Sequence, residues 1–205
     1  MKLIIILAFS ILTVYQCPAQ QKTTHGITPQ EREKEFQLLK QTEAGVFAAV
    51  KGLSDAQLNF KPAADKWSIA ECIKHIAAAE KELWAMATPT LSQPPNPEKK
   101  VDIKFNDDEL VKAVEDRAHK SKTFAALEPA NSPYSTVPEA LAAFKADREK
   151  LIAFVKSTDT DLRNHIVVLP VGTYDTYQYI LLIAAHSNRH TQQIEEVKTN
   201  ANFPK

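Results

Sequence analysis

The sequence predicts an all-α fold, a four-helix bundle with long crossover connections plus one minor helix. The chain of 205 residues contains only 4 glycines but 12 prolines, which is typical of helices joined by proline-containing loops. Helix-capping motifs recur along the chain, and no alternation of apolar and polar residues extends beyond residues 166–169. The length suits one domain with a full hydrophobic core.

The first long helix is predicted over residues 28–51. Thr28 and Glu31 form a capping box, in which each side chain can bond to a backbone N–H of the other residue, and Pro29 suits the first helical position. Apolar residues recur at helical spacing along this segment and give it one buried face. A single further turn is expected at residues 54–57.

The second long helix is predicted to begin at Ser68, which forms another capping box with Glu71. Its apolar residues form one stripe, and we expect the helix to end near Ala87, before the pair Thr88-Pro89. A proline-rich crossover follows through residues 94–97. The segment therefore contributes one face to the bundle core.

Two more helices and an extended segment complete the chain. The minor helix is predicted over residues 106–127, with a modest apolar stripe, and a third capping box opens a long helix over residues 136–156. Residues 161–170 look extended. The last helix is predicted to start at Gly172-Thr173 and to run to about Thr199.

Residues 1–19 are predicted to be a signal peptide. A charged start precedes about a dozen apolar residues, too few for a transmembrane helix, and small residues allow cleavage after Ala19. Residues 20–27 then form a polar tail. A lipoprotein acylated on Cys17 is the alternative, but Tyr15-Gln16 stands where small residues are wanted. We expect export to the periplasm or outside the cell, with membrane contact only through the uncleaved signal peptide.

The charge balance and cysteine content limit the partners and crosslinks. Basic and acidic residues balance at 25 each, and no basic run carries interleaved aromatic residues, so nucleic-acid binding is not expected. A small-molecule substrate is the expected partner, and a homodimer is compatible with the sequence. Cleavage would leave Cys72 as the sole cysteine, so no internal disulfide is expected. Cys72 lies on the inward stripe and is interpreted as a small buried hydrophobic residue.

His186 and His190 are candidate metal ligands. Four residues span just over one helical turn, so both imidazoles project from the same side, near the middle of the apolar stripe. Each buried neutral imidazole keeps a donor and an acceptor to satisfy, and a divalent metal can accept a lone pair from both rings. The alternative is a chance spacing, in which each ring is half-buried and bonded to a carbonyl group.

His75 is the candidate for a third ligand. It lies at the flank of its helix's apolar stripe, where it can reach across the seam between two helices, and the small residues 77–79 leave room for a cavity. On its own, His75 is also compatible with an ordinary flanking histidine. If His75, His186 and His190 share one ion, their nearest ring nitrogens should lie about 3–3.5 Å apart.

Several other residues carry weaker functional hypotheses. Glu80 and Glu82 follow His75 and could act as bases near the site, although solvated helix charges are the favoured interpretation. Aromatic residues near the mouth of the bundle could line a pocket, although core packing explains most such residues: Trp67, Tyr174, Tyr177 and Tyr179. His119 and His165 are interpreted as surface or loop residues outside the site.

Two segments resemble the DinB-like family of metal-binding four-helix-bundle proteins. Residues 66–75 are similar to the family's W-S-x-x-E-x-x-x-H helix, and residues 186–194 are similar to its terminal H-x-x-x-H-x-x-Q-[IL] helix. The resemblance covers residues 28–205, as one bundle domain. It implies that His75, His186 and His190 together bind one divalent ion. Zinc or nickel suits three imidazoles best, and iron is the alternative.

The resemblance implies a metal-dependent hydrolase or transferase that acts on a small molecule. Three histidines leave an open coordination position, where a bound water or thiol becomes more acidic. Relatives include transferases that use bacillithiol or mycothiol and an isomerase of the maleylpyruvate type. Those transferases work in the cytoplasm, so an exported member departs from the pattern. The alternative function is a non-catalytic exported module that binds a metal or a small molecule, and no catalytic residue is assigned.

Overall fold

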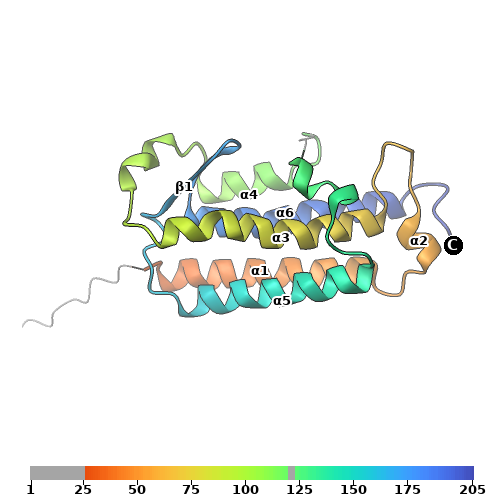
Figure 1. Cartoon of the computed structure of the whole chain (residues 1–205), viewed down its shortest axis with the longest axis horizontal. Coiled ribbons are helices and arrows are strands. Elements are labelled where there is room, and N and C mark those ends of the chain that lie inside the picture. The colour runs from red at the N-terminus through yellow and green to blue at the C-terminus, as the bar shows by residue number, and fades with distance from the viewer. Residues whose placement is uncertain (1–25, 120–122) are drawn as a thin grey trace, which may run out of the picture.

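The computed structural model describes residues 26–119 and 123–205, and it confirms the predicted fold class. Four long helices lie along one another: α1 (Pro29–Val50), α3 (Ile69–Leu91), α5 (Val137–Ser157) and α6 (Thr176–Lys198) (Figure 1). Helices α1 and α6 run in one direction, and α3 and α5 run in the other. The end of α3 and the start of α5 therefore lie at opposite ends of the bundle, whereas residues 158–175 join α5 to α6 at a single end.

Capping boxes begin most of the helices, as predicted. Both reciprocal hydrogen bonds are present at Thr28, Ser68 and Thr136, which precede α1, α3 and α5. Equivalent boxes at Ser54 and Asn106 precede the short helices α2 (Asp55–Asn59) and α4 (Asp107–Glu115). Each box satisfies backbone N–H groups that a helix otherwise leaves without partners, so the sequence determines where these helices start.

The minor helix is shorter than predicted. We expected a helix over residues 106–127, but α4 ends at Glu115, and two short 3-10 turns, η2 (Ala125–Leu127) and η3 (Pro129–Asn131), lie further along. Asp116 adopts an extended backbone, and its carboxylate accepts from the N–H of Ala118 and pairs with the His119 ring. An aspartate that bonds to the following residues competes with helix continuation.

The second long helix instead extends further than predicted, to Leu91, with Pro89 inside it. Proline lacks the N–H that would bond to the carbonyl of Ala85. The hydroxyl of Thr88 donates to that carbonyl at 3.2 Å and to the carbonyl of Trp84 at 3.0 Å. The side chain thus replaces the missing backbone bond, and the helix continues for its last turn.

A β-hairpin occupies the segment before α6, so the predicted start of the last helix is wrong. Strands β1 (Ile166–Leu169) and β2 (Gly172–Asp175) pair antiparallel. Gly172 has a φ of 150°, and a Cβ there would lie 2.5 Å from the Tyr174 hydroxyl, so the turn requires glycine. Helix α6 begins after Asp175, whose carboxylate accepts from the N–H of Gln178.

The hydrophobic core consists of two apolar clusters with a polar layer between them. Arg148 is fully buried, and its guanidinium forms a bidentate pair with Glu80 at 2.6 and 2.8 Å. It also donates to the Leu39 carbonyl and to the hydroxyls of Thr42 and Ser187. One guanidinium therefore connects α1, α3, α5 and α6.

The structure tests three interpretations made from the sequence: Glu80 as a solvated charge, His165 as a surface or loop residue, and Cys72 as a buried residue. Glu80 is buried in this ion pair, so its interpretation as a solvated charge is wrong. His165 lies in a loop but is buried, where its ring nitrogens bond to the carbonyls of Asp161 and Gln93. Cys72 is fully buried, as predicted, and burial raises the pKa of its thiol to about 12.

No helix among residues 26–119 and 123–205 is long and apolar enough to cross a membrane. The predicted signal peptide, residues 1–19, lies outside the described residues, as does the polar tail up to residue 25.

Glu35 on α1 is fully buried, and within the described part of the chain neither of its carboxylate oxygens has a hydrogen-bond partner. Burial raises the pKa of this carboxyl well above 4.5, aided by Asp175 and Glu31 and opposed by Arg163 and Arg32. The folded state thus holds a proton that the unfolded chain releases above about pH 4.5. The contribution of Glu35 to the free energy of unfolding should consequently fall as the pH rises above that value, by up to about 1.4 kcal/mol per pH unit, until Glu35 ionises.

Replacing Glu35 with glutamine should remove this dependence. We expect the Glu35→Gln variant to match the natural protein near pH 4.5 and to be increasingly more stable towards pH 8, because the amide cannot ionise. Urea denaturation at several pH values measures the difference. Glu33→Gln on the exposed side of the same helix is the control and should show no such trend. A constant difference at all pH values would show that Glu35 is ionised in the folded protein.

Candidate metal centre

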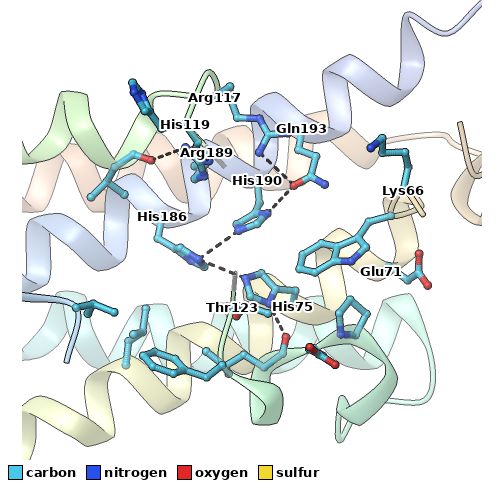
Figure 2. Close-up of a pocket in the computed structure, with 18 of the residues that line it drawn as sticks. Lys66, Glu71, His75, Arg117, His119, Thr123, His186, Arg189, His190 and Gln193 are labelled. Carbon is cyan, nitrogen blue, oxygen red and sulfur yellow. Dashed lines mark hydrogen bonds between the residues drawn. The ribbon is translucent and has the colours of Figure 1, made fainter. Parts of the chain in front are cut away.

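The structure brings His75, His186 and His190 together between α3 and α6 (Figure 2). The Nε2 atom of His186 lies 3.3 Å from Nε2 of His75 and 3.2 Å from Nε2 of His190. These distances fall within the range expected from the sequence for three rings that share one ion. Each ring offers one nitrogen to the cluster, and these three atoms all lie within 4.8 Å of one another.

Helix geometry and neighbouring acceptors set the orientation of two rings. His75 Nδ1 lies 2.7 Å from the Leu127 carbonyl oxygen, and His190 Nδ1 lies 2.9 Å from Oε1 of Gln193. Because both partners only accept, each Nδ1 carries the hydrogen and each Nε2 keeps a free lone pair. The two lone pairs therefore face the centre of the cluster, as metal ligation requires.

Arg117 fixes the amide that orients His190. Its guanidinium donates to Oε1 of Gln193 at 3.4 Å and pairs with the carboxylate of Glu196 at 2.8 and 2.9 Å. The amide oxygen of Gln193 consequently receives hydrogen bonds from both Arg117 and His190. This arrangement connects the loop after α4 to the last helix and holds the His190 ring in place (Figure 2).

The protein environment keeps the three rings neutral. Burial is the largest cause in each case and lowers the pKa of His75, lowers that of His186 to about 3, and lowers that of His190 well below 6.5. The neighbouring rings add to the effect at His186 and His190. At neutral pH, each ring thus has one nitrogen with an available lone pair.

The histidines line a cavity of about 890 Å³. That volume lies within the usual range for small-molecule sites. Helices α3 and α6 supply one side, and residues of the crossover supply another: Ala113, Val114, Arg117, Phe124, Leu127 and Pro129. The arrangement can therefore place a small molecule directly against the three ring nitrogens.

The other candidate residues divide into two groups. Trp67 and Tyr174 line the cavity, and Trp67 stacks on His190 with ring centroids 5.7 Å apart. Tyr177 and Tyr179 are instead fully buried in the core. His119 is an exposed loop residue, as predicted. It also lines the cavity, although the sequence had placed it outside the site.

Some groups that contribute to the site were not assigned a role from the sequence. Gln193 follows His190 by three residues, so helical spacing alone could have identified it as an orienting partner. Arg117 and the Leu127 carbonyl come from segments that are distant in sequence from the last helix. No local pattern marks such groups. Glu80 and Glu82 do not line the cavity, so neither is placed to act as a base there.

Comparisons with known proteins agree with this geometry. The family model of the DinB superfamily matches residues 38–194, which include all three histidines. The chain is 29% identical over 150 residues to the uncharacterized protein YuaE of Bacillus subtilis (strain 168), and the match covers 73% of this chain and 88% of YuaE.

A solved structure shares the fold. The chain is similar to YfiT from Bacillus subtilis, described as a probable metal-dependent hydrolase with an unusual four-helix bundle topology. The TM-score is 0.60, at 16% identity, and the match covers 87% of this chain and 92% of YfiT. The likeness extends over nearly the whole bundle, so the topology in Figure 1 is a shared one.

Proposed function

The chain belongs to the DinB superfamily, and we propose on this basis that it is a divalent-metal-dependent hydrolase or transferase acting on a small molecule. The observation that carries the proposal is the convergence of three ring nitrogens, all within 4.8 Å of one another, on the wall of a large cavity. His75, His186 and His190 would hold the ion. No side chain of the cavity is assigned as a catalytic base.

The spacing of the nitrogens supports a metal site. In a tetrahedral site with metal–nitrogen bonds of about 2.0–2.1 Å, two ligand nitrogens lie about 3.3 Å apart. The two Nε2 separations of 3.3 and 3.2 Å agree with that value. Without an ion or a shared proton, three lone pairs would oppose one another in a buried place, so the donor set itself favours a cation.

The number of ligands favours an enzyme over a non-catalytic metal-binding module. Among the described residues, the cluster contains three potential ligands and no fourth histidine, cysteine, aspartate or glutamate. Structural zinc sites usually have four protein ligands, whereas catalytic sites keep one position open. When bound, the ion would acidify a water or thiol at that position and polarise a substrate.

The protein's own residues have definable tasks in this proposal. The Leu127 carbonyl and Gln193 hold two of the rings so that their Nε2 atoms face the ion. Trp67 covers His75 and His190 with its indole ring, at centroid distances of 4.9 and 5.7 Å, and limits access of water from that side. The cavity then orients the substrate against the cluster.

Metal analysis of the purified protein tests the proposal. We expect close to one divalent ion per chain, and zinc or nickel suits the three imidazoles best, with iron as the alternative. Activity towards small ester, amide or electrophilic substrates should disappear with a chelator and return with the ion. Stoichiometric metal without any turnover over a broad substrate panel would instead support the binding module, and absence of metal binding would contradict both.

Replacing Gln193 with leucine should weaken metal binding without unfolding the protein. The His190 ring would lose the acceptor that fixes its tautomer, and the loss of such a partner typically costs about 10–100-fold in metal affinity. Competition with a chromophoric chelator measures the affinity, and circular dichroism checks the fold. Gln37→Leu, an exposed position on α1, is the matched control. Equal affinities in both variants would contradict an orienting role for Gln193.

Export is a separate proposal. We propose that residues 1–19 are removed during export to the periplasm or outside the cell, which would leave a protein that begins near Gln20 without a disulfide. Mass spectrometry of the protein from its native host tests this. An intact Met1, or a lipid on Cys17, would contradict it.

The assembly we propose is a homodimer, which sedimentation equilibrium would identify.

A further inference from the structure

The charged side chains on the wall of the histidine-lined cavity are paired or solvated. Lys61 pairs with Glu71 at 2.7 Å, and Lys66 pairs with Asp65 at 2.8 Å. Both lysine side chains are also half-exposed, so water solvates them. Glu128, the remaining carboxylate of the wall, is exposed to solvent. These groups therefore need no counter-charge from a ligand.

The two arginines of the wall are engaged as well. Arg117 forms a bidentate pair with the carboxylate of Glu196, at 2.8 and 2.9 Å. Arg189 donates to three backbone carbonyls between residues 114 and 119. Since the three histidines are neutral, the described part of the wall gives a charged ligand no counter-ion that is not already bound or solvated.

The wall on one side of the histidines is apolar. Helices α3 and α6 run antiparallel, so the part of α3 beyond His75 lies beside the part of α6 that precedes His186 (Figure 1). The residues that line the cavity there are Leu83 of α3, Leu182 of α6 and Tyr174 of β2. The spacing from His75 to Leu83 gives this side a length of about 12 Å along the helix axis.

Two exposed apolar side chains line the same cavity. Phe124 and Val171 are 38% and 58% exposed. A bound apolar molecule would remove part of their surface from water, which favours binding. The hydroxyl of Tyr174 donates to the carbonyl of Val171 at 3.1 Å, so this polar group already has a partner.

We propose that the cavity binds a small molecule with an uncharged, apolar body and one polar group. The body lies against Leu83, Leu182 and Tyr174, and the polar group faces the three histidines. This substrate class rests on the proposed function, because it places the reacting group at the metal site. The pairing of the charges and the apolar side of the wall do not depend on the ion.

Straight-chain primary alcohols test the apolar body. Calorimetry on the full chain, freed of metal by a chelator, should show that each added methylene from butanol to octanol tightens binding by up to about fourfold. The amino alcohol and the hydroxy acid of the same chain length, charged at the far end, should each bind at least about tenfold more weakly than octanol. Whichever end enters first, a polar group then meets the apolar side. An affinity that does not depend on chain length, or a charged analogue that binds as tightly as octanol, would overturn the proposal.

Two valines of the hairpin segment provide a matched pair of variants. Val171 lines the cavity and Val168 does not, and their exposed fractions are similar, at 58% and 55%. Val171→Asn should weaken octanol binding by about fourfold, because apolar surface is lost from the wall, and Val168→Asn should leave it unchanged. Both positions are exposed, so the fold should survive, which circular dichroism checks. Equal affinities for octanol in the two variants would contradict this placement of the body.

Co²⁺ distinguishes failure of this inference from failure of the proposed function. The visible absorption of Co²⁺ reports on the metal site, and saturation with octanol should change that spectrum because the hydroxyl reaches the ion. An unchanged spectrum with octanol bound would show that the polar group does not face the histidines, and this inference alone would be wrong. If the protein binds no Co²⁺, the proposed function fails, and the alcohol series on the metal-free chain still decides whether the body is apolar.

Discussion

Replacing His190 with alanine is expected to abolish stoichiometric metal binding. The variant keeps only two of the three converging nitrogens, and it also removes the ring that Gln193 and Trp67 hold in place. Two imidazoles on a cavity wall bind a divalent ion far more weakly than three do. Metal content after dialysis against a weak chelator measures the effect, and we expect less than a tenth of the ion to remain.

The fold of the His190→Ala variant should largely survive. The apolar stripes of the four helices, and not an ion, supply most of the stability. His165→Ala is a control for loss of a buried histidine, because His165 also bonds with both ring nitrogens but lies outside the metal cluster. It should lose stability and keep its metal. Full metal content in His190→Ala would contradict the three-histidine site.

Replacing Arg148 with methionine is expected to cost about 3–5 kcal/mol of unfolding free energy. The guanidinium is fully buried, so its loss would leave the Glu80 carboxylate without a counter-charge and the Leu39 carbonyl, Thr42 and Ser187 without a donor. Many domains have a total stability of only about 5–15 kcal/mol, so the variant should approach the unfolding threshold. Urea denaturation at pH 7 measures the loss.

Two further measurements identify the cause of this loss. Burial already raises the pKa of Glu80 and Arg148 opposes that rise, so Arg148→Met should let Glu80 take up a proton more readily. The variant should then be less destabilised at pH 5 than at pH 8. Adding Glu80→Met should recover part of the stability, because a well-packed apolar pair removes the buried charge. Absence of both effects would show that lost packing, and not charge, explains the result.

The elements that the sequence predicts correctly are those with local causes. The capping boxes at Thr28, Ser68 and Thr136 act over three residues, so the starts of α1, α3 and α5 follow from short motifs. The pairing of His186 with His190 follows in the same way from helical spacing. The placement of His75 required the family resemblance, since its own position on the stripe was compatible with an ordinary flanking histidine.

The elements that the sequence misplaces depend on contacts between distant segments. The end of α4 involves Asp116, where Arg189 from the last helix bonds to the backbone. Glu80 reads as one of many helix charges until Arg148, which lies 68 residues away, is placed opposite it. The hairpin before α6 is too short for a periodic pattern to distinguish two strands from a helix start.

The origin of the cavity wall bears on how such a protein can diversify. The histidines belong to two helices of the bundle, whereas much of the wall around them comes from residues 113–119 and 123–130 of the crossover between α3 and α5. Mutations or insertions in that connection can reshape the cavity while the three histidines stay on rigid helices. Leu127 is the exception, because its carbonyl holds His75. Evolution can thus change the shape of the cavity through the crossover and retain the three histidines in the helices.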